Sequence, residues 1–171
     1  MRARALVALL APLCLGAGAP DPVEMKVAAV LPVRGGGAAV VLIDSAETQA
    51  LPILVGGTEA ISINLRLAKQ HLERPLTHDL VDSIVRELGG KVVRAQVDEI
   101  RDGTYIGSVF LQVGERVARI DARSSDAIAL ALGNALPIFV ARKVLDAAGV
   151  SPDSLDGPEK TRATKRRQGP I

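Results

Sequence analysis

The stretch DARSSDAIALA, residues 121–131, places two carboxylates, one arginine and two serines directly before an apolar run. Two carboxylates, an arginine and a helix N-terminus at one strand end could bind a divalent metal ion or a phosphate. A structural explanation is also complete, with Ser124 or Ser125 capping a helix. Asp126 would then complement the helix dipole, and Arg123 would form a local ion pair. Spacing alone favours the structural explanation, because acids and serines are ordinary residues at helix starts.

The stretch ERPLTHDL, residues 73–80, is the second candidate for chemistry. Thr77 is expected to cap a helix, with His78 and Asp79 in its first turn and Arg74 nearby. His78 could act there as a general base or a metal ligand, with Asp79 orienting it or sharing the metal. His78 could equally do no more than cover the helix end.

Several other kinds of site are not supported by the sequence. The chain has two histidines and one cysteine, so a zinc site is not expected. LPILVGGTEA, residues 51–60, has a glycine pair before Glu59 but lacks the lysine of a P-loop and the third glycine of a dinucleotide fingerprint, so no nucleotide cofactor is expected. No serine lies in a Gly-x-Ser-x-Gly elbow, so this motif gives no support for a hydrolase triad.

The elements that must position these residues follow from periodicity and turn residues. Apolar runs predict strands over 23–44 as a hairpin, and over 51–57, 91–100, 104–113, 116–122 and 136–140. Helices are predicted over 58–71, 77–88, 125–132 and 142–148, with Thr58 as the first cap. The inward faces of the first two helices are predicted to carry Ile61, Leu65, Ala68 and Leu72, and then Leu80, Val81, Ile84, Val85 and Leu88. This order predicts an α+β fold with about four helices and a curved, mostly antiparallel mixed sheet.

The two ends of the chain differ in composition from its body. Residues 1–19 combine two arginines, an apolar stretch and a small-residue end, which is typical of a signal peptide and predicts export; an uncleaved apolar segment is the alternative. Residues 20–150 then form the domain, and residues 151–171 a basic tail expected to be disordered. With no tryptophan, one tyrosine and two phenylalanines, the body lacks the stacking platforms of an OB-type or RRM-type binder.

Three ordered blocks resemble the signature of the bifunctional nuclease domain family. They are Leu51-Pro52-Ile53 with Gly56 and Glu59-Ala60, then residues 74–80, then residues 121–131. The resemblance covers about Val23 to Val150, and its polar matches are Glu59, Arg74, Thr77, His78, Asp79, Asp121, Arg123, Ser125 and Asp126. Ser124 departs from the proline usual in the family, which removes no reactive group.

The resemblance implies a roll-like homodimeric domain with nuclease activity on DNA, RNA or both. His78, Asp79, Asp121 and Asp126 would be its catalytic residues, and the three aspartates would hold Mg²⁺ or Mn²⁺ against the scissile phosphate. Arg74, Arg123 and Ser125 would bind the substrate, and Glu59 and Thr77 are further matches. After signal cleavage no membrane span is expected.

The competing interpretation is a non-catalytic dimeric scaffold or ligand-binding domain. In it the arginine and aspartate clusters stabilise loops or an interface. A nearly neutral body with few aromatic residues favours this interpretation, and the family resemblance favours the enzyme. The two differ in whether the acids and His78 share an open pocket or lie apart.

Overall fold

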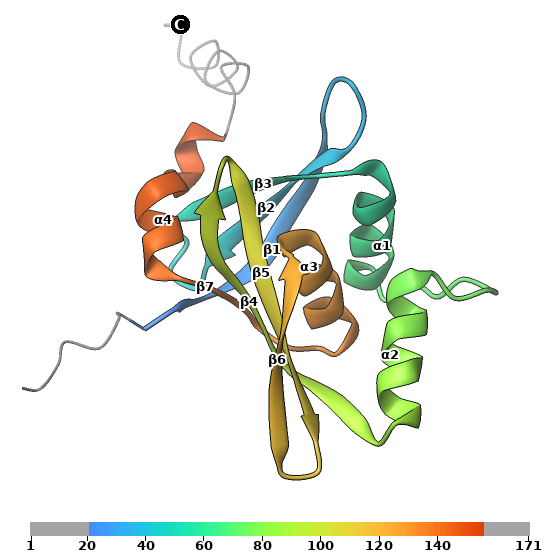
Figure 1. Cartoon of the computed structure of the whole chain (residues 1–171). Helices are drawn as coiled ribbons and strands as arrows, with labels where there is room; N and C mark the ends of the chain where they lie inside the picture. Colours follow the sequence, from blue (N-terminus) through green and yellow to red (C-terminus); the bar gives the residue numbers. More distant parts are fainter. Residues whose placement is uncertain (1–20, 156–171) are drawn as a thin grey trace, which may run out of the picture.

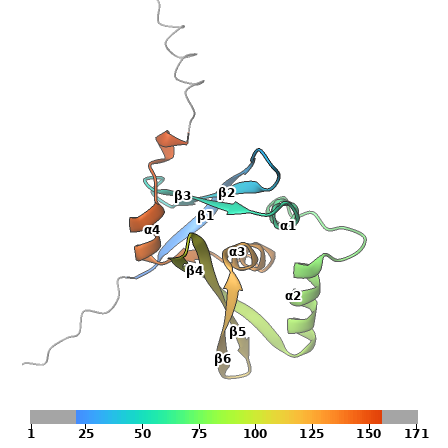
Figure 2. The same cartoon turned by 45° about the horizontal axis from the view of Figure 1, so that its top comes forward.

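The computed structural model describes residues 21–155 (Figures 1 and 2). The predicted signal peptide, residues 1–19, and residues 156–171 of the predicted tail lie outside the described residues. The strands are β1 (Val23–Pro32), β2 (Ala38–Asp44), β3 (Ala50–Val55), β4 (Gly90–Arg101), β5 (Thr104–Val113), β6 (Arg116–Arg123) and β7 (Ile138–Val140). The helices are α1 (Gly57–Leu67), α2 (Thr77–Glu87), α3 (Ser124–Gly133) and α4 (Arg142–Ala148), followed by the 3₁₀ turn η1 (Pro152–Ser154).

All seven strands join one sheet in the order β3-β2-β1-β7-β4-β5-β6. Among the described residues only β4 and β7 pair in parallel, and every other neighbouring pair is antiparallel. Breaks of register in β1 and β4 mark bulges, which bend a strand and increase its twist. The α+β prediction, with a curved, mostly antiparallel mixed sheet and four α-helices, is therefore confirmed.

The turn between β4 and β5 has two residues whose types suit its geometry. Asp102 and Gly103 both adopt positive φ, at 50° and 75°. A two-residue hairpin turn whose twist matches that of its strands requires this conformation, and Asp-Gly accepts it at low cost. The result is a long hairpin that carries the third strand, β6, along its edge.

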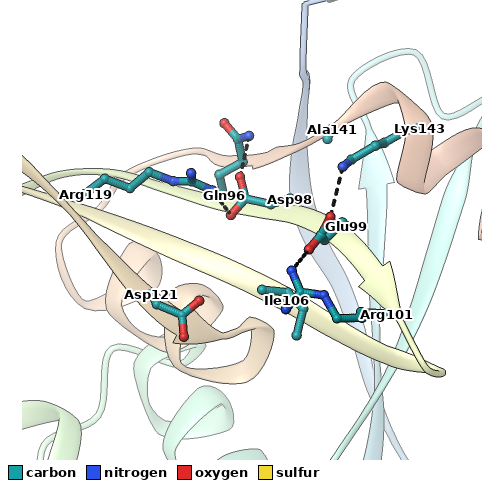
Figure 3. A pocket seen from close by; sticks show the side chains of 9 residues that line it. All are labelled: Gln96, Asp98, Glu99, Arg101, Ile106, Arg119, Asp121, Ala141 and Lys143. Atoms are coloured by element: carbon teal, nitrogen blue, oxygen red, sulfur yellow. Dashed lines mark hydrogen bonds and ion pairs between the residues drawn. The ribbon is translucent and has the colours of Figure 1, made fainter.

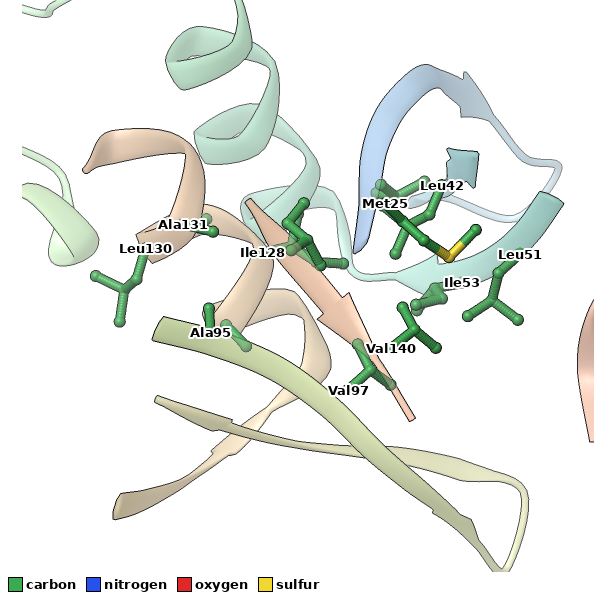
Figure 4. Close-up of a cluster of buried hydrophobic side chains, with 14 of the residues drawn as sticks. Met25, Leu42, Leu51, Ile53, Ala95, Val97, Ile128, Leu130, Ala131 and Val140 are labelled. Carbon is green, nitrogen blue, oxygen red and sulfur yellow. The ribbon is translucent and has the colours of Figure 1, made fainter. Parts of the chain in front are cut away.

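Helix α3 lies in the hollow of the curled sheet and forms the centre of the core (Figure 2). The five consecutive residues 127–131 are all buried, as expected for a helix that packs on every side. Figure 4 shows Ile128 of α3 facing Val140 and Val97 of the sheet. Gly107 of β5 permits this packing, because a Cβ there would lie 3.2 Å from the Cα of Ser124 and 3.3 Å from the Cβ of Ala127.

Helix α1 differs from its prediction in its bounds and in its buried face. It begins at Gly57, with Gly56 rather than Thr58 as the cap residue, and it ends at Leu67, short of His71. A left-handed residue, Lys69, follows shortly after this end. Ile61 is 58 % exposed, so the predicted apolar face does not point to the core. The inward residues are Ala60, Ser62 and Ile63.

The caps of α2 and α3 also differ from the prediction. Leu76 precedes α2 and Arg123 precedes α3, and neither Thr77 nor a serine makes a side-chain cap hydrogen bond. Ser124 and Ser125 are instead buried in the first turn of α3.

Helix α2 buries no residue completely; Leu80, Ile84 and Leu88 of its predicted inward face are exposed. Among residues 21–155, no helix combines the length and apolar character needed to cross a membrane.

The turn after β2 generates the first prediction. The Asp44 carboxylate accepts hydrogen bonds from the backbone N–H groups of Thr48 and Gln49 and from the Thr48 hydroxyl, at 2.7, 3.0 and 2.7 Å. The Gln49 N–H has the largest effect on the pKa of Asp44, and with Thr48 it outweighs burial and lowers that pKa below 3.8. Because the folded state lowers this pKa, the carboxylate stabilises the fold above about pH 4, and this contribution is lost as the pH falls through the folded-state pKa.

Asp44→Ala is expected to lower the free energy of unfolding by about 2 kcal/mol at pH 7. The difference from the unsubstituted protein should shrink below pH 3.8, where the carboxyl of the unfolded chain takes up a proton, and should vanish as the pH falls through the lower folded-state pKa. Urea denaturation at pH 7 and pH 3 measures both effects. Asp146→Ala, at an exposed position of α4, is the control and should have little effect. An equal loss at both pH values would contradict the assigned role of the carboxylate.

Candidate active site

The first turns of α2 and α3 bring His78 and Asp126 together, although 48 residues separate them in sequence. His78 Nε2 lies 3.2 Å from Asp126 Oδ1. The His78 side chain is 12 % exposed and that of Asp126 is 25 % exposed. The structure therefore joins the two sequence stretches that carry most of the candidate residues.

Arg123 binds both acids of this cluster from the end of β6. Its Nε and Nη2 atoms donate to the two Asp126 oxygens at 2.9 and 2.8 Å, and its Nη1 donates to Glu59 Oε1 at 2.8 Å. A guanidinium has five N–H groups, so two are left for another acceptor. The Arg123 side chain is 64 % exposed, which leaves this cation open to a ligand.

These contacts shift the ionisation of all three charged groups. Burial opposes ionisation of Asp126, but hydrogen bonds from Arg123 and His78 outweigh it and lower the pKa of Asp126. The pKa of Glu59 is lowered by its own backbone N–H and by Arg123. Hydrogen bonds to Asp126 and Glu59 raise the pKa of Arg123 above its usual value. Both acids are thus ionised and Arg123 is charged at neutral pH.

Ser62 of α1 completes the cluster, and the sequence reasoning did not find it. Its Oγ lies 2.8 Å from His78 Nδ1, and the residue is only 4 % exposed. The signal in the sequence was the spacing of Glu59, Ser62 and Arg66, because residues three and four apart share one face of a helix. These three residues form a polar stripe along α1.

Arg66 forms a second cluster of charged side chains, which the sequence reasoning also did not find. Its guanidinium donates to Asp79 at 2.7 Å and to the carbonyl of Ala129 at 3.1 Å, and it lies 2.8 Å from Asp82. The Arg66 side chain is only 7 % exposed. The second oxygen of Asp79 accepts the backbone N–H of Leu76 at 2.9 Å. Asp79 is therefore held in an ion pair and a helix cap that join α1 to α2.

Asp121 does not join the His78 cluster. It points from β6 into a separate cavity of about 580 Å³, on the sheet face that carries the Asp98–Arg119 ion pair (Figure 3). Within residues 21–155, the side chain of Asp121 makes no hydrogen bond or ion pair, although its backbone pairs with β5. Strand alternation places Asp121 and Arg123 on the same face, but only Arg123 lies at the strand end where α3 begins.

The remaining sequence candidates have varied positions. Arg74 is exposed in the α1–α2 loop and forms no ion pair within the part of the chain that the structure describes. Thr77 lies in the wall of the pocket that holds His78. Ser125 is 7 % exposed and lines the neighbouring pocket.

Two pockets meet at Glu59 and Arg123. The smaller, about 150 Å³, is lined by Thr58, Glu59, Ser62, Leu76, Thr77, His78, Arg123 and Asp126. The larger, about 570 Å³, includes Tyr105, Pro52 and Leu54 in its wall. The larger pocket has the size of an ordinary small-molecule site, about 300–1,000 Å³, whereas the smaller holds only a small group. Together they could accept a small charged group beside a larger moiety.

The predicted metal ligands do not fit one metal ion. In residues 21–155 no three His, Cys, Asp or Glu side chains are grouped so as to hold one. Both oxygens of Asp79 and both of Asp126 are already hydrogen-bonded, and Asp121 lies in another cavity. Dependence on Mg²⁺ or Mn²⁺ remains a prediction from the sequence.

Comparisons with known proteins define the class of protein. The family description "bifunctional nuclease domain" matches residues 40–153, so the chain belongs to the bifunctional nuclease domain family. The matched range contains all residues of the His78 cluster. Two uncharacterized proteins, from two strains of Mycobacterium tuberculosis, are each 35 % identical over 107 residues, which is 62 % of this chain. The chain matches 63 % of the length of these relatives.

The Arg66 cluster generates the second prediction. Removal of one partner from a buried ion pair leaves the other charge uncompensated, which costs about 3–5 kcal/mol. Arg66→Ala is therefore expected to lower the free energy of unfolding by about 3 kcal/mol or more, measured by urea denaturation.

Arg74→Ala is the matched control, because Arg74 is exposed and should change this free energy by less than about 0.5 kcal/mol. Equal effects of the two substitutions would show that the buried pair does not hold α1 and α2 together.

Proposed function

We propose that this domain hydrolyses phosphodiester bonds of DNA or RNA at the His78 cluster. One observation carries the proposal: an imidazole held between a hydroxyl and an ionised carboxylate in the wall of a pocket, next to an arginine with unused N–H groups. Membership of the bifunctional nuclease domain family supports the substrate class. The cluster supplies a base, a residue that orients it, and a cation for developing charge.

The protonation of the His78 ring follows from its partners. Asp126 is ionised and can only accept a hydrogen bond, so His78 Nε2 carries the proton between them. His78 Nδ1 is then the ring atom that can take up a proton during the reaction. Asp126 orients the ring and stabilises the positive charge that it acquires, and Arg123 holds Asp126 in place.

Arg123 is the group suited to the phosphate. Its two unused N–H groups can donate to phosphate oxygens, whose charge increases as the bond breaks. Glu59 and Asp126 together carry one more negative charge than Arg123 neutralises. The proton that His78 takes up during the reaction removes this excess, at the stage when the charge on the phosphate oxygens increases.

The two pockets suit the two parts of a nucleotide. The smaller one, beside His78, accommodates the phosphate, and the larger one, beyond Arg123, accommodates a nucleoside. Tyr105 in the wall of the larger pocket offers an aromatic ring on which a base can stack. The roles proposed for His78, Asp126 and Arg123 involve no metal ion.

The competing function is a non-catalytic scaffold, and one observation favours it. Arg123 and Arg66 pair with Glu59, Asp126, Asp79 and Asp82, and these contacts join α1, α2 and α3. Such networks stabilise folds without any chemistry. The two functions differ in whether a substitution at His78 changes cleavage without unfolding the protein.

Two further properties belong to the proposal. Residues 1–19 would direct export, so that the protein meets nucleic acid outside the cytoplasm, and the domain would act as a homodimer. The support for export is the signal-like composition of the N-terminus, and for the dimer the family resemblance.

The third prediction concerns cleavage of single- and double-stranded DNA and of RNA by the purified protein, with Mg²⁺, Mn²⁺ or EDTA. His78→Gln and Asp126→Asn should each lower the rate about 100-fold or more, the usual contribution of a general base. His71→Gln is the matched control, because His71 is the other histidine and is exposed. It should cleave at the unsubstituted rate.

Asp121→Asn distinguishes the His78 cluster from the catalytic set predicted from the sequence, because Asp121 belongs only to the predicted set. This variant should cleave at the unsubstituted rate. Loss of cleavage in Asp121→Asn, with Asp126→Asn unaffected, would place the chemistry in the other cavity. Absence of cleavage by the unsubstituted protein under all conditions would favour the scaffold. Circular dichroism and thermal unfolding of each variant establish that it is folded.

A further inference from the structure

Ser62, His78 and Asp126 have the geometry of an activated nucleophile. The hydroxyl lies 2.8 Å from one ring nitrogen, and the carboxylate lies 3.2 Å from the other. A nucleophile within about 2.6–3.2 Å of a base that a third group orients is the usual signature of covalent catalysis. The arrangement uses three helices and no linear motif, which is why the absence of a Gly-x-Ser-x-Gly elbow does not bear on it.

The hydrogen-bond directions restrict what His78 can do. Nε2 is committed as a donor to Asp126, so Nδ1 is the only ring atom that can accept a proton. The group next to Nδ1 is the Ser62 hydroxyl. A base that removes a proton at this position therefore acts first on Ser62. Ser62 also lines the small pocket, together with His78, Asp126 and Arg123.

We propose that Ser62 is the nucleophile of this site and forms a covalent phosphoserine intermediate. The inference rests on the proposed phosphodiesterase function. In the first step Ser62 Oγ bonds to phosphorus, its proton moves to His78 Nδ1, the phosphorus–oxygen bond to the leaving group breaks, and the leaving oxygen takes the proton. In the second step water attacks phosphorus, its proton moves to His78, and the bond to Ser62 breaks as Oγ recovers the proton. The sum is one water consumed and one phosphodiester bond cleaved.

Ser108 provides a matched comparison within the same chain. It is buried to a similar degree, at 1 % exposure, but its hydroxyl has no hydrogen-bond partner within residues 21–155. Burial alone therefore does not distinguish the two serines. Of these two serines, Ser62 alone has an imidazole that can remove its proton.

The test is reaction of the purified protein with diisopropyl fluorophosphate, which phosphorylates activated hydroxyl groups with loss of fluoride. Mass spectrometry of the digested, unsubstituted protein should place a single adduct on Ser62 and none on Ser108. His78→Gln should slow labelling about 100-fold or more. Ser62→Ala should abolish it, and Ser108→Ala should label at the unsubstituted rate. The labelling site in the unsubstituted protein is decisive even where Ser62→Ala is unstable.

The outcomes separate this inference from the proposed function. An adduct at another residue, no adduct, or a rate independent of His78 would overturn the role of Ser62. Cleavage of nucleic acid that persists in folded Ser62→Ala would overturn it as well and leave the proposed function standing. Labelling of Ser62 without any cleavage of DNA or RNA would support the activated serine and count against nucleic acid as the substrate.

Discussion

The carboxylate of Asp126 determines how the site is built. It accepts two hydrogen bonds from Arg123 and one from His78, and Arg123 extends the contact to Glu59. One side chain on α3 thereby fixes groups from β6, α2 and, through Arg123, α1. Its charge also decides which nitrogen of His78 carries a proton, because an ionised carboxylate can only accept. Geometry and protonation at the site have the same origin.

Much of the fold could be predicted because local sequence patterns specify the elements that form it. The Asp102-Gly103 turn, the alternation of β6 and the short apolar run of α3 each agree with the structure they form. The buried face of α1 could not be predicted in the same way. Ile61 is more apolar than Ser62, and yet Ser62 is the buried residue, because α1 packs mainly against α3 and its inward side also meets His78 at the polar start of α2. Tertiary contacts override the apolar pattern there.

The candidate site could be predicted only in part, for a related reason. His78, Arg123, Asp126 and Glu59 lie in stretches that stand out in sequence, and the structure brings them together. Asp121 stands out equally, but it lies within β6, three positions before α3 begins, and lines a different cavity from Asp126. Arg66 and Ser62 lie in no such stretch. Proximity along the chain indicates which residues are polar, whereas the meeting of α1, α2 and α3 decides which ones touch.

The position of β7 has a consequence for how the chain acquires its structure. β7 is only three residues long and comes near the end of the domain, but it lies between β1 and β4 and so joins the two halves of the sheet. Val140 of β7 pairs with Val23 of β1, which comes more than a hundred residues earlier in the chain. The hairpins on either side can form from neighbouring segments. The two halves of the sheet, however, cannot be joined until the ribosome has released almost the whole domain. Such distant pairing slows folding, because the entropy cost of closing the long loop must be met before the contact contributes any stabilisation.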